Sequence, residues 1–166
     1  MKKFLIVNFP GHGHVNPTLK LVKELINFGN DVVYYCTEEF RDKIEQTGAI
    51  FKSYKFKAVE EEERGNQDSI LENEVNLSDG ILAKILNEKE NFDVIIYDSV
   101  LSVGEDIAKK LNIKETVSLY TTFAISKNMI SRRMKTSPQS SLIESSSIKF
   151  KKRTEEINKK YDIELK

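Results

Sequence analysis

The sequence is poor in the residues and runs that mark secreted or membrane proteins. It has one cysteine, Cys36, and no tryptophan; a single cysteine excludes an internal disulfide framework and fits a reducing compartment. No apolar run is long enough to cross a bilayer. The first run, residues 4–9, stops at Pro10 and Gly11, which also argues against a signal peptide. We therefore expect a cytoplasmic protein without a membrane partner.

An excess of charge of one sign is also missing. Lys and Arg together number 26, as do Asp and Glu, so the formal net charge is zero. Such a chain has no dominant electrostatic attraction to nucleic acid or to an anionic membrane. The basic residues within 149–153 are followed closely by acids, which further weakens a nucleic-acid hypothesis. The expected partner is a small molecule or another protein.

The length of the chain allows one sizeable core, because 39% of its 166 residues are hydrophobic. We expect one domain over residues 1–136, followed by a Ser-rich segment and an amphipathic helix over residues 137–166. The Ser-rich part, residues 137–147, predicts a mobile surface segment or a lid. The four acids at 60–63 could suggest a metal site, but adjacent acids on a loop are usually just solvated. We therefore expect no metal.

Short apolar segments alternate with helical patterns along the first 120 residues. Strands are predicted at residues 4–9, 31–36, 49–54, 92–98 and 116–120. Helices are predicted from Asn16 and Pro17 to Gly29, over 37–48, around 81–86 and around 103–111. Short connections between alternating strands and helices favour an α/β fold with a doubly wound, Rossmann-like parallel sheet.

The expected sheet brings two ionisable side chains together. A doubly wound sheet places its first strand between the second and the fourth, and ligands bind at the carboxyl ends of the strands there. Asp98 ends the fourth strand, and His14 follows the first strand by a few residues. A carboxylate on one imidazole nitrogen fixes the tautomer and supports the imidazolium that forms when the other nitrogen takes a proton. The pair predicts a general base, although Asp98 as the N-cap of the next helix remains the alternative.

Gly11 and Gly13 raise a dinucleotide-binding alternative. Asn16 occupies the third glycine position of a G-x-G-x-x-G pattern, so the helix would lose its close-packing glycine. Glu38, near the end of the second strand, could serve as the ribose-binding acid, but a first-turn acid favoured by the helix dipole is the plain alternative. A stand-alone dinucleotide-binding or interaction module is therefore the second hypothesis.

Residues 9–19, Phe-Pro-Gly-His-Gly-His-Val-Asn-Pro-Thr-Leu, resemble the start of macrolide-type UDP-glycosyltransferases, which belong to glycosyltransferase family 1 and have the GT-B fold. The resemblance continues through 31–40, 93–98 and 120–124 and covers nearly the whole chain. It implies the N-terminal, acceptor-binding half of such an enzyme. The chain departs from the family at residues 113–114, where a proline is common, and residues 55–68 are too variable to map onto the acceptor pocket.

The resemblance also implies roles for individual residues. His14 would deprotonate an acceptor hydroxyl and Asp98 would orient it, in an inverting single displacement that needs no metal. Six residues would contact substrate: Pro10, Gly11, His12, Gly13, Thr121 and Thr122. For Thr121 and Thr122 a plain turn role is the alternative, and His12 is expected to face solvent or line the pocket.

A second half of the enzyme is implied as well. In the family a C-terminal domain with a His-Cys-Gly-type turn and an Asp-Gln pair binds the UDP-sugar donor, and neither motif occurs in these 166 residues. We therefore expect a truncated enzyme or one chain of a split enzyme, inactive alone and without a cofactor of its own. The acceptor would be a hydroxylated small molecule such as a macrolide or another aglycone. Apolar surface left by the missing half favours self-association of the fragment.

Overall fold

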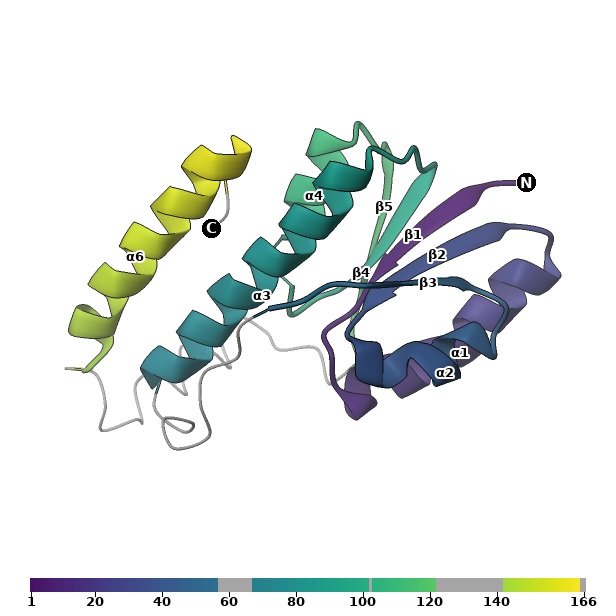
Figure 1. The fold of residues 1–166 in the computed structure, drawn as a ribbon, viewed down its shortest axis with the longest axis horizontal. Helices are drawn as coiled ribbons and strands as arrows, with labels where there is room; N and C mark the ends of the chain where they lie inside the picture. The colour runs from purple at the N-terminus through teal and green to yellow at the C-terminus, as the bar shows by residue number, and fades with distance from the viewer. Residues whose placement is uncertain (57–66, 102, 122–141, 165–166) are drawn as a thin grey trace.

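A five-stranded parallel sheet forms the centre of the protein. The computed structural model describes residues 1–56, 67–101, 103–121 and 142–164. The strands are β1 (Lys3–Val7), β2 (Asp31–Cys36), β3 (Ile50–Ser53), β4 (Val94–Asp98) and β5 (Glu115–Leu119). Their order is β3-β2-β1-β4-β5, so β1 lies between β2 and β4 (Figure 1). The predicted doubly wound sheet is confirmed, and each strand lies within two residues of its predicted bounds.

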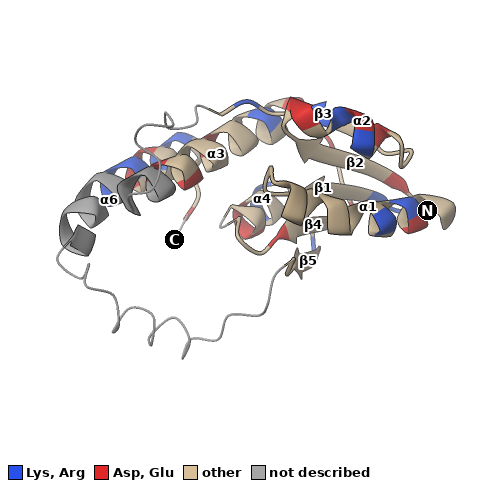
Figure 2. Ribbon diagram, turned by 90° about the horizontal axis from the view of Figure 1, so that it is seen from below, with Lys and Arg blue, Asp and Glu red and all other residues tan. Residues whose placement is uncertain are grey.

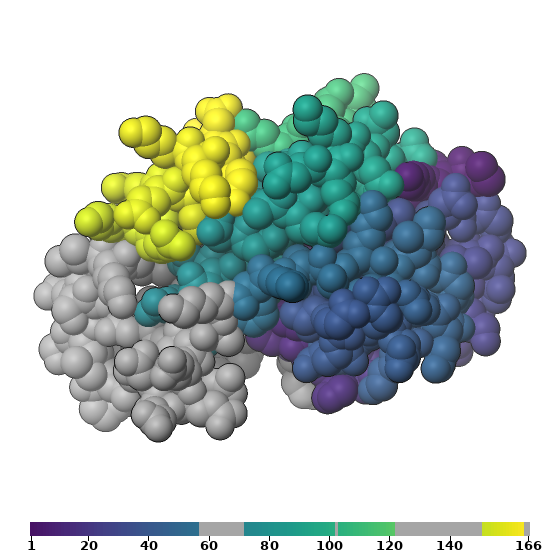
Figure 3. Space-filling view, in the orientation of Figure 1, coloured from purple at the N-terminus to yellow at the C-terminus, as the bar shows by residue number. Residues whose placement is uncertain are grey.

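Helices cover both faces of the sheet (Figure 1). One face carries α1 (His12–Asn27), the short helix η1 (Glu38–Phe40) and α2 (Arg41–Glu45). The other carries α3 (Gln67–Glu88) and α4 (Gly104–Lys110). A further helix, α6 (Leu142–Tyr161), packs on the outside of α3, and Figure 3 shows the two in direct contact. Acidic and basic residues are interspersed along these helices, as Figure 2 shows.

The two apolar clusters follow from the alternation of side chains along each strand. Leu5 and Val7 of β1 belong to the cluster under α3 and α4, whereas Ile6 belongs to the cluster under α1 and α2. Because β1 is buried on both faces, it reads in the sequence as a continuous apolar run. β5 differs, since most of its residues are exposed.

The predicted start of the first helix is wrong. α1 begins at His12 with Gly11 as its N-cap, and Pro17 lies inside the helix. An N–H at position 17 would have paired with the Gly13 carbonyl. Gly13 is exposed, so water can reach that carbonyl and the helix tolerates the proline. His14 therefore lies in the first helical turn.

Two other helices begin earlier in the chain than predicted. The Ser-rich segment was expected to be mobile over 137–147, but α6 already begins at Leu142; its earlier residues, and the acidic stretch 60–63, lie outside the described residues. The helix expected around 81–86 is α3, which extends back to Gln67. In the part of the chain that the structure describes, no helix combines the length and apolarity needed to cross a membrane.

Candidate functional site

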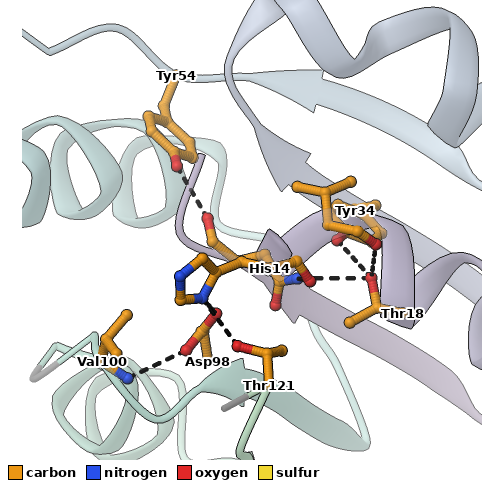
Figure 4. Close-up of polar contacts among 9 residues, drawn as sticks. His14, Thr18, Tyr34, Tyr54, Asp98, Val100 and Thr121 are labelled. Carbon is orange, nitrogen blue, oxygen red and sulfur yellow. Dashed lines mark hydrogen bonds and ion pairs between the residues drawn. The ribbon is translucent and has the colours of Figure 1, made fainter. Parts of the chain in front are cut away.

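His14 and Asp98 meet at the carboxyl ends of β1 and β4, as the sheet order predicts. His14 projects from the first turn of α1, and Asp98 is the last residue of β4. The imidazole Nδ1 lies 2.6 Å from Asp98 Oδ2. The Asp98 side chain is 0% exposed and the His14 side chain 21% exposed. One side of the imidazole is therefore fixed on a buried carboxylate, while part of the ring remains open to solvent (Figure 4).

Both oxygens of the Asp98 carboxylate have partners. Oδ1 accepts a hydrogen bond from the backbone N–H of Val100 at 3.1 Å. The N-cap of α4 is Val103, so the alternative in which Asp98 caps that helix is wrong. A carboxylate only accepts hydrogen bonds, so the neutral imidazole tautomer that fits this contact has its proton on Nδ1 and a free lone pair on Nε2. This is the tautomer that a general base at Nε2 requires.

Thr121 is the third side chain at this imidazole. It follows β5, and its Oγ1 lies 2.9 Å from His14 Nδ1. The Nδ1 proton is thus within reach of two oxygen acceptors, Asp98 Oδ2 and Thr121 Oγ1, which restrict rotation of the ring. Thr122, which the sequence groups with Thr121, lies outside the described residues.

The turn around Gly11 lies close to the imidazole. The Gly11 N–H donates to the Phe9 carbonyl at 2.9 Å, and the Gly11 carbonyl accepts from the N–H groups of His14 and Val15 at 2.9 Å each. A Cβ at Gly11 would lie 3.4 Å from His14 Cδ2. Pro10, which precedes this turn, is partly buried. The backbone of the turn therefore borders the ring, without a side chain at position 11 to cover it.

His12 lies apart from the His14–Asp98 pair. It is exposed, and its ring meets Phe40 edge-on, with centroids 5.1 Å apart. Lys43 Nζ lies 3.5 Å from His12 Nδ1. The structure thus places His12 beside η1 and α2, at the surface, and Gly13 next to it is also exposed.

Comparison with known proteins gives the family. No protein-family model matches the chain. The uncharacterized UDP-glucosyltransferase YojK of Bacillus subtilis is 30% identical over 177 residues, which cover 100% of this chain and 43% of YojK. The NDP-glycosyltransferase YjiC of the same organism is 35% identical over 134 residues, 75% of this chain and 33% of YjiC. The chain therefore spans less than half the length of these curated relatives.

Solved structures share the fold. The glycosyltransferase of kitacinnamycin superimposes with a TM-score of 0.77 at 18% identity, over 96% of this chain and 40% of that protein. The calicheamicin glycosyltransferase CalG4 gives 0.73 at 24% identity, over 90% of this chain and 43% of CalG4. The chain belongs to the GT-B glycosyltransferases. It corresponds to the N-terminal part of their fold.

A buried polar network supports the site of this GT-B domain, and the sequence interpretation missed it. Asn8, 0% exposed, donates from Nδ2 to the His14 carbonyl at 2.9 Å. The Tyr54 hydroxyl donates to the Asn8 carbonyl at 3.0 Å, and the Tyr34 and Thr18 hydroxyls lie 2.8 Å apart. Burial raises the pKa of Tyr34 and of Tyr54 well above the usual range, so both remain neutral. The available signal was Asn8 itself, the one polar residue within the otherwise apolar run 4–9.

Other candidate residues of the GT-B domain have structural explanations. Glu38 forms an ion pair with Arg41 at the surface. Cys36 is buried, and burial raises the pKa of its thiol to about 12, which makes it unreactive. Among the described residues, no group of three or more His, Cys, Asp or Glu side chains could hold a metal ion.

Proposed function

We propose that this chain is the acceptor-binding domain of an inverting nucleotide-sugar glycosyltransferase that acts on a hydroxylated small molecule. The observation that carries the proposal is the 2.6 Å contact between His14 Nδ1 and the buried Asp98 carboxylate, which leaves Nε2 available as a base. The named activities of YojK, a UDP-glucosyltransferase, and YjiC, an NDP-glycosyltransferase, support the reaction type.

In the proposed reaction, Nε2 of His14 takes the proton of an acceptor hydroxyl. The acceptor oxygen attacks the anomeric carbon of the donor sugar from the face opposite the nucleotide. The bond from that carbon to the diphosphate oxygen breaks, and the nucleoside diphosphate leaves with the electron pair. The proton stays on His14, and Asp98 stabilises the resulting imidazolium.

Exposed apolar side chains beside the pair favour an apolar acceptor. Phe9 is 38% exposed, Val100 44% and Tyr120 66%. The Phe9 ring lies 5.0 Å from the His14 ring, while Val100 and Tyr120 neighbour the Asp98 and Thr121 positions in sequence. Pockets for drug-sized ligands are mostly apolar with a few polar groups that orient the ligand. An aglycone of macrolide type fits this description, and one structural neighbour, the rhamnosyltransferase SpnG, is complexed with spinosyn aglycone.

The donor is proposed to bind to a second domain. The chain covers only 43% of YojK, so most of that relative lies outside the match. The structural neighbours SsfS6 and SpnG have been solved with thymidine diphosphate, which supports a nucleotide-sugar donor here. We propose residues 1–136 as the acceptor domain and residues 137–166 as the segment that leads toward the donor domain, anchored by the packing of α6 on α3.

Replacement of His14 tests the proposal. In a protein that includes the donor domain, His14→Ala should lower turnover by about 10²- to 10⁴-fold, the usual contribution of a general base, while the unfolding transition stays in place. Lys23→Ala, an exposed change on the same helix, is the matched control. Product formation from UDP-glucose is followed by mass spectrometry, and the anomeric configuration by NMR. Unchanged turnover in His14→Ala would refute the base assignment, and retention of configuration would refute the single displacement.

A further inference from the structure

The main chain of His14 is held by a buried amide. Asn8 directly follows β1, and its Nδ2 lies 2.9 Å from the His14 carbonyl oxygen. A carbonyl oxygen can only accept, so the nitrogen of the amide must face it, and this fixes which way the Asn8 side chain points. The same Nδ2 lies 3.4 Å from Thr18 Oγ1. The residue therefore spans two successive turns of α1 from beneath.

This arrangement leaves part of Asn8 unsatisfied. Its Oδ1 is buried without a hydrogen-bond partner among the described residues. A buried acceptor that lost its water costs stability, whereas an apolar side chain of similar shape would carry no such cost. Thr18 Oγ1, the second partner of Nδ2, has other hydrogen bonds: it donates to the Val15 carbonyl at 2.8 Å and meets the Tyr34 hydroxyl. Stability alone thus gives little reason for an asparagine here.

The first turn of α1 has few other restraints. Its N-cap, Gly11, makes no side-chain capping bond, and Gly13 has no Cβ to pack against a neighbour. Pro17 removes the N–H that would bond the Gly13 carbonyl. Glycine also increases the conformational freedom of the backbone. A turn of this composition needs an external restraint if the residue it carries is to stay in one place.

We propose that Asn8 is a positioning residue for His14, and this rests on the proposed function. By bonding the His14 carbonyl it fixes the main chain that carries the imidazole, while Asp98 and Thr121 fix the ring itself. The carbonyl of Asn8 in turn accepts the Tyr54 hydroxyl at 3.0 Å. Asn8 therefore connects the end of β1 to the residue after β3 and to the first turn of α1. These bonds hold the main chain of His14 and so set the direction of its Nε2. Figure 4 shows Tyr54 and Thr18 on sides of His14 other than that of Asp98.

The test compares Asn8→Leu with Tyr34→Phe in a protein that includes the donor domain. Asn8→Leu removes the amide and its unsatisfied oxygen, so the unfolding midpoint should stay the same or rise. A small misplacement of a reacting group can cost about 10²-fold in rate, and we expect kcat to fall by about 10- to 100-fold with KM changed less than about threefold. Tyr34→Phe removes a hydroxyl from the same network but leaves the Asn8–His14 bond, and its kcat should stay near that of the unchanged protein. Asn8→Ala serves as a second variant if the leucine does not fold.

The histidine side chains give a readout that does not depend on activity. The ¹⁵N imidazole signals of His12 and His14 are assigned in the same protein by comparison with His12→Gln and His14→Gln. Asn8→Leu should change the His14 signals, which report the hydrogen bond of Nδ1, and Tyr34→Phe should not. The proposal is overturned if kcat is retained in folded Asn8→Leu, or if Tyr34→Phe loses as much. If the His14 signals respond but no form of the protein transfers a sugar, the positioning role stands and the proposed function fails.

Discussion

Asp98 and Asp79 each gather several polar partners, but they do so in different surroundings. Asp98 is fully buried and holds the imidazole of His14. Asp79, on α3, keeps 25% of its side chain exposed and receives the Lys160 ammonium of α6 at 2.8 Å. The Tyr161 hydroxyl donates to the same oxygen at 2.6 Å. We refer to Asp79, Arg153, Lys160 and Tyr161 as the α3–α6 seam.

The difference lies in what balances each carboxylate. In the seam, burial alone would raise the pKa of Asp79, but the hydrogen bonds from Lys160 and Tyr161 outweigh it and lower that pKa below its usual value. Lys160 and Arg153, two cations at the surface, balance the charge of Asp79. The seam therefore serves to hold α6 on α3. Asp98 faces an imidazole, and in the proposed reaction its charge stabilises the imidazolium that forms there. A buried acid whose partner can gain a proton is the arrangement typical of catalysis.

The largest effect is expected when the two acids are exchanged for amides. Asp98→Asn should lower turnover by about 10²- to 10⁴-fold, because the amide no longer selects the Nδ1–H tautomer or stabilises the imidazolium. Asp79→Asn should leave turnover within about twofold, since surface ion pairs contribute little. Steady-state rates of the two variants, in a protein with the donor domain, make the comparison. Equal losses would show that the contrast between site and seam is false.

Each region also contains a glycine that admits no side chain. A Cβ at Gly104 would lie 2.2 Å from Cδ2 of Tyr97, the neighbour of Asp98, and a Cβ at Gly80, beside Asp79, would lie 2.3 Å from the Lys55 carbonyl oxygen. Overpacking of this kind typically costs about 1–3 kcal/mol, so Gly104→Ala and Gly80→Ala should each lower the free energy of unfolding by about that amount.

Gly13 provides the control for these two variants. A Cβ there would meet no atom within 4 Å, and alanine suits a helix better than glycine, so Gly13→Ala should not lower the free energy of unfolding. Urea denaturation measures all three. Gly104→Ala should additionally disturb the His14 NMR signals through Tyr97 and Asp98, whereas Gly80→Ala should not. A response of His14 to both would mean that the seam and the site are mechanically coupled.

The seam should make stability depend on pH. Because the pKa of Asp79 is lowered in the folded protein, its contribution is fully present above the pKa that this carboxyl has in the unfolded chain, near 3.8. It is lost as the pH falls through the lower, folded value. At neutral pH we expect Asp79→Asn to cost about 0.5–1 kcal/mol, and the difference from the unchanged protein should disappear in strong acid. A constant difference across this range would show that packing, and not charge, holds α6 on α3. The matched control is Asp162→Asn, which also turns an acid into an amide but removes an exposed partner of Lys110, outside the seam.

The site and the seam also differ in how far the sequence predicts them. Apolar runs and their spacing predict the strand order, and the strand order alone brings Asp98 to His14. The start of α1 was misplaced because Asn16 and Pro17 are a strong local capping signal. Contacts of the earlier turn, such as the bond from Asn8 to the His14 carbonyl, form only in the folded sheet and cannot be read from local sequence. The Asp79–Lys160 pair joins residues 81 positions apart, on helices whose patterns do not show that they pack together.

The smallest effect is expected at the exposed pair of Glu38 and Arg41. The hydrogen bond from Arg41 lowers the pKa of Glu38, but both side chains are largely exposed and solvent screens the pair. Glu38→Gln should therefore shift Tm by less than about 1 °C in thermal denaturation, even at low ionic strength.

The same variant separates the two functional hypotheses, because a dinucleotide-binding module would use Glu38 to bind the ribose, whereas the proposed acceptor domain does not. We expect calorimetry to show the same dinucleotide affinity for Glu38→Gln as for the unchanged protein. A clear loss of affinity would instead restore the dinucleotide hypothesis.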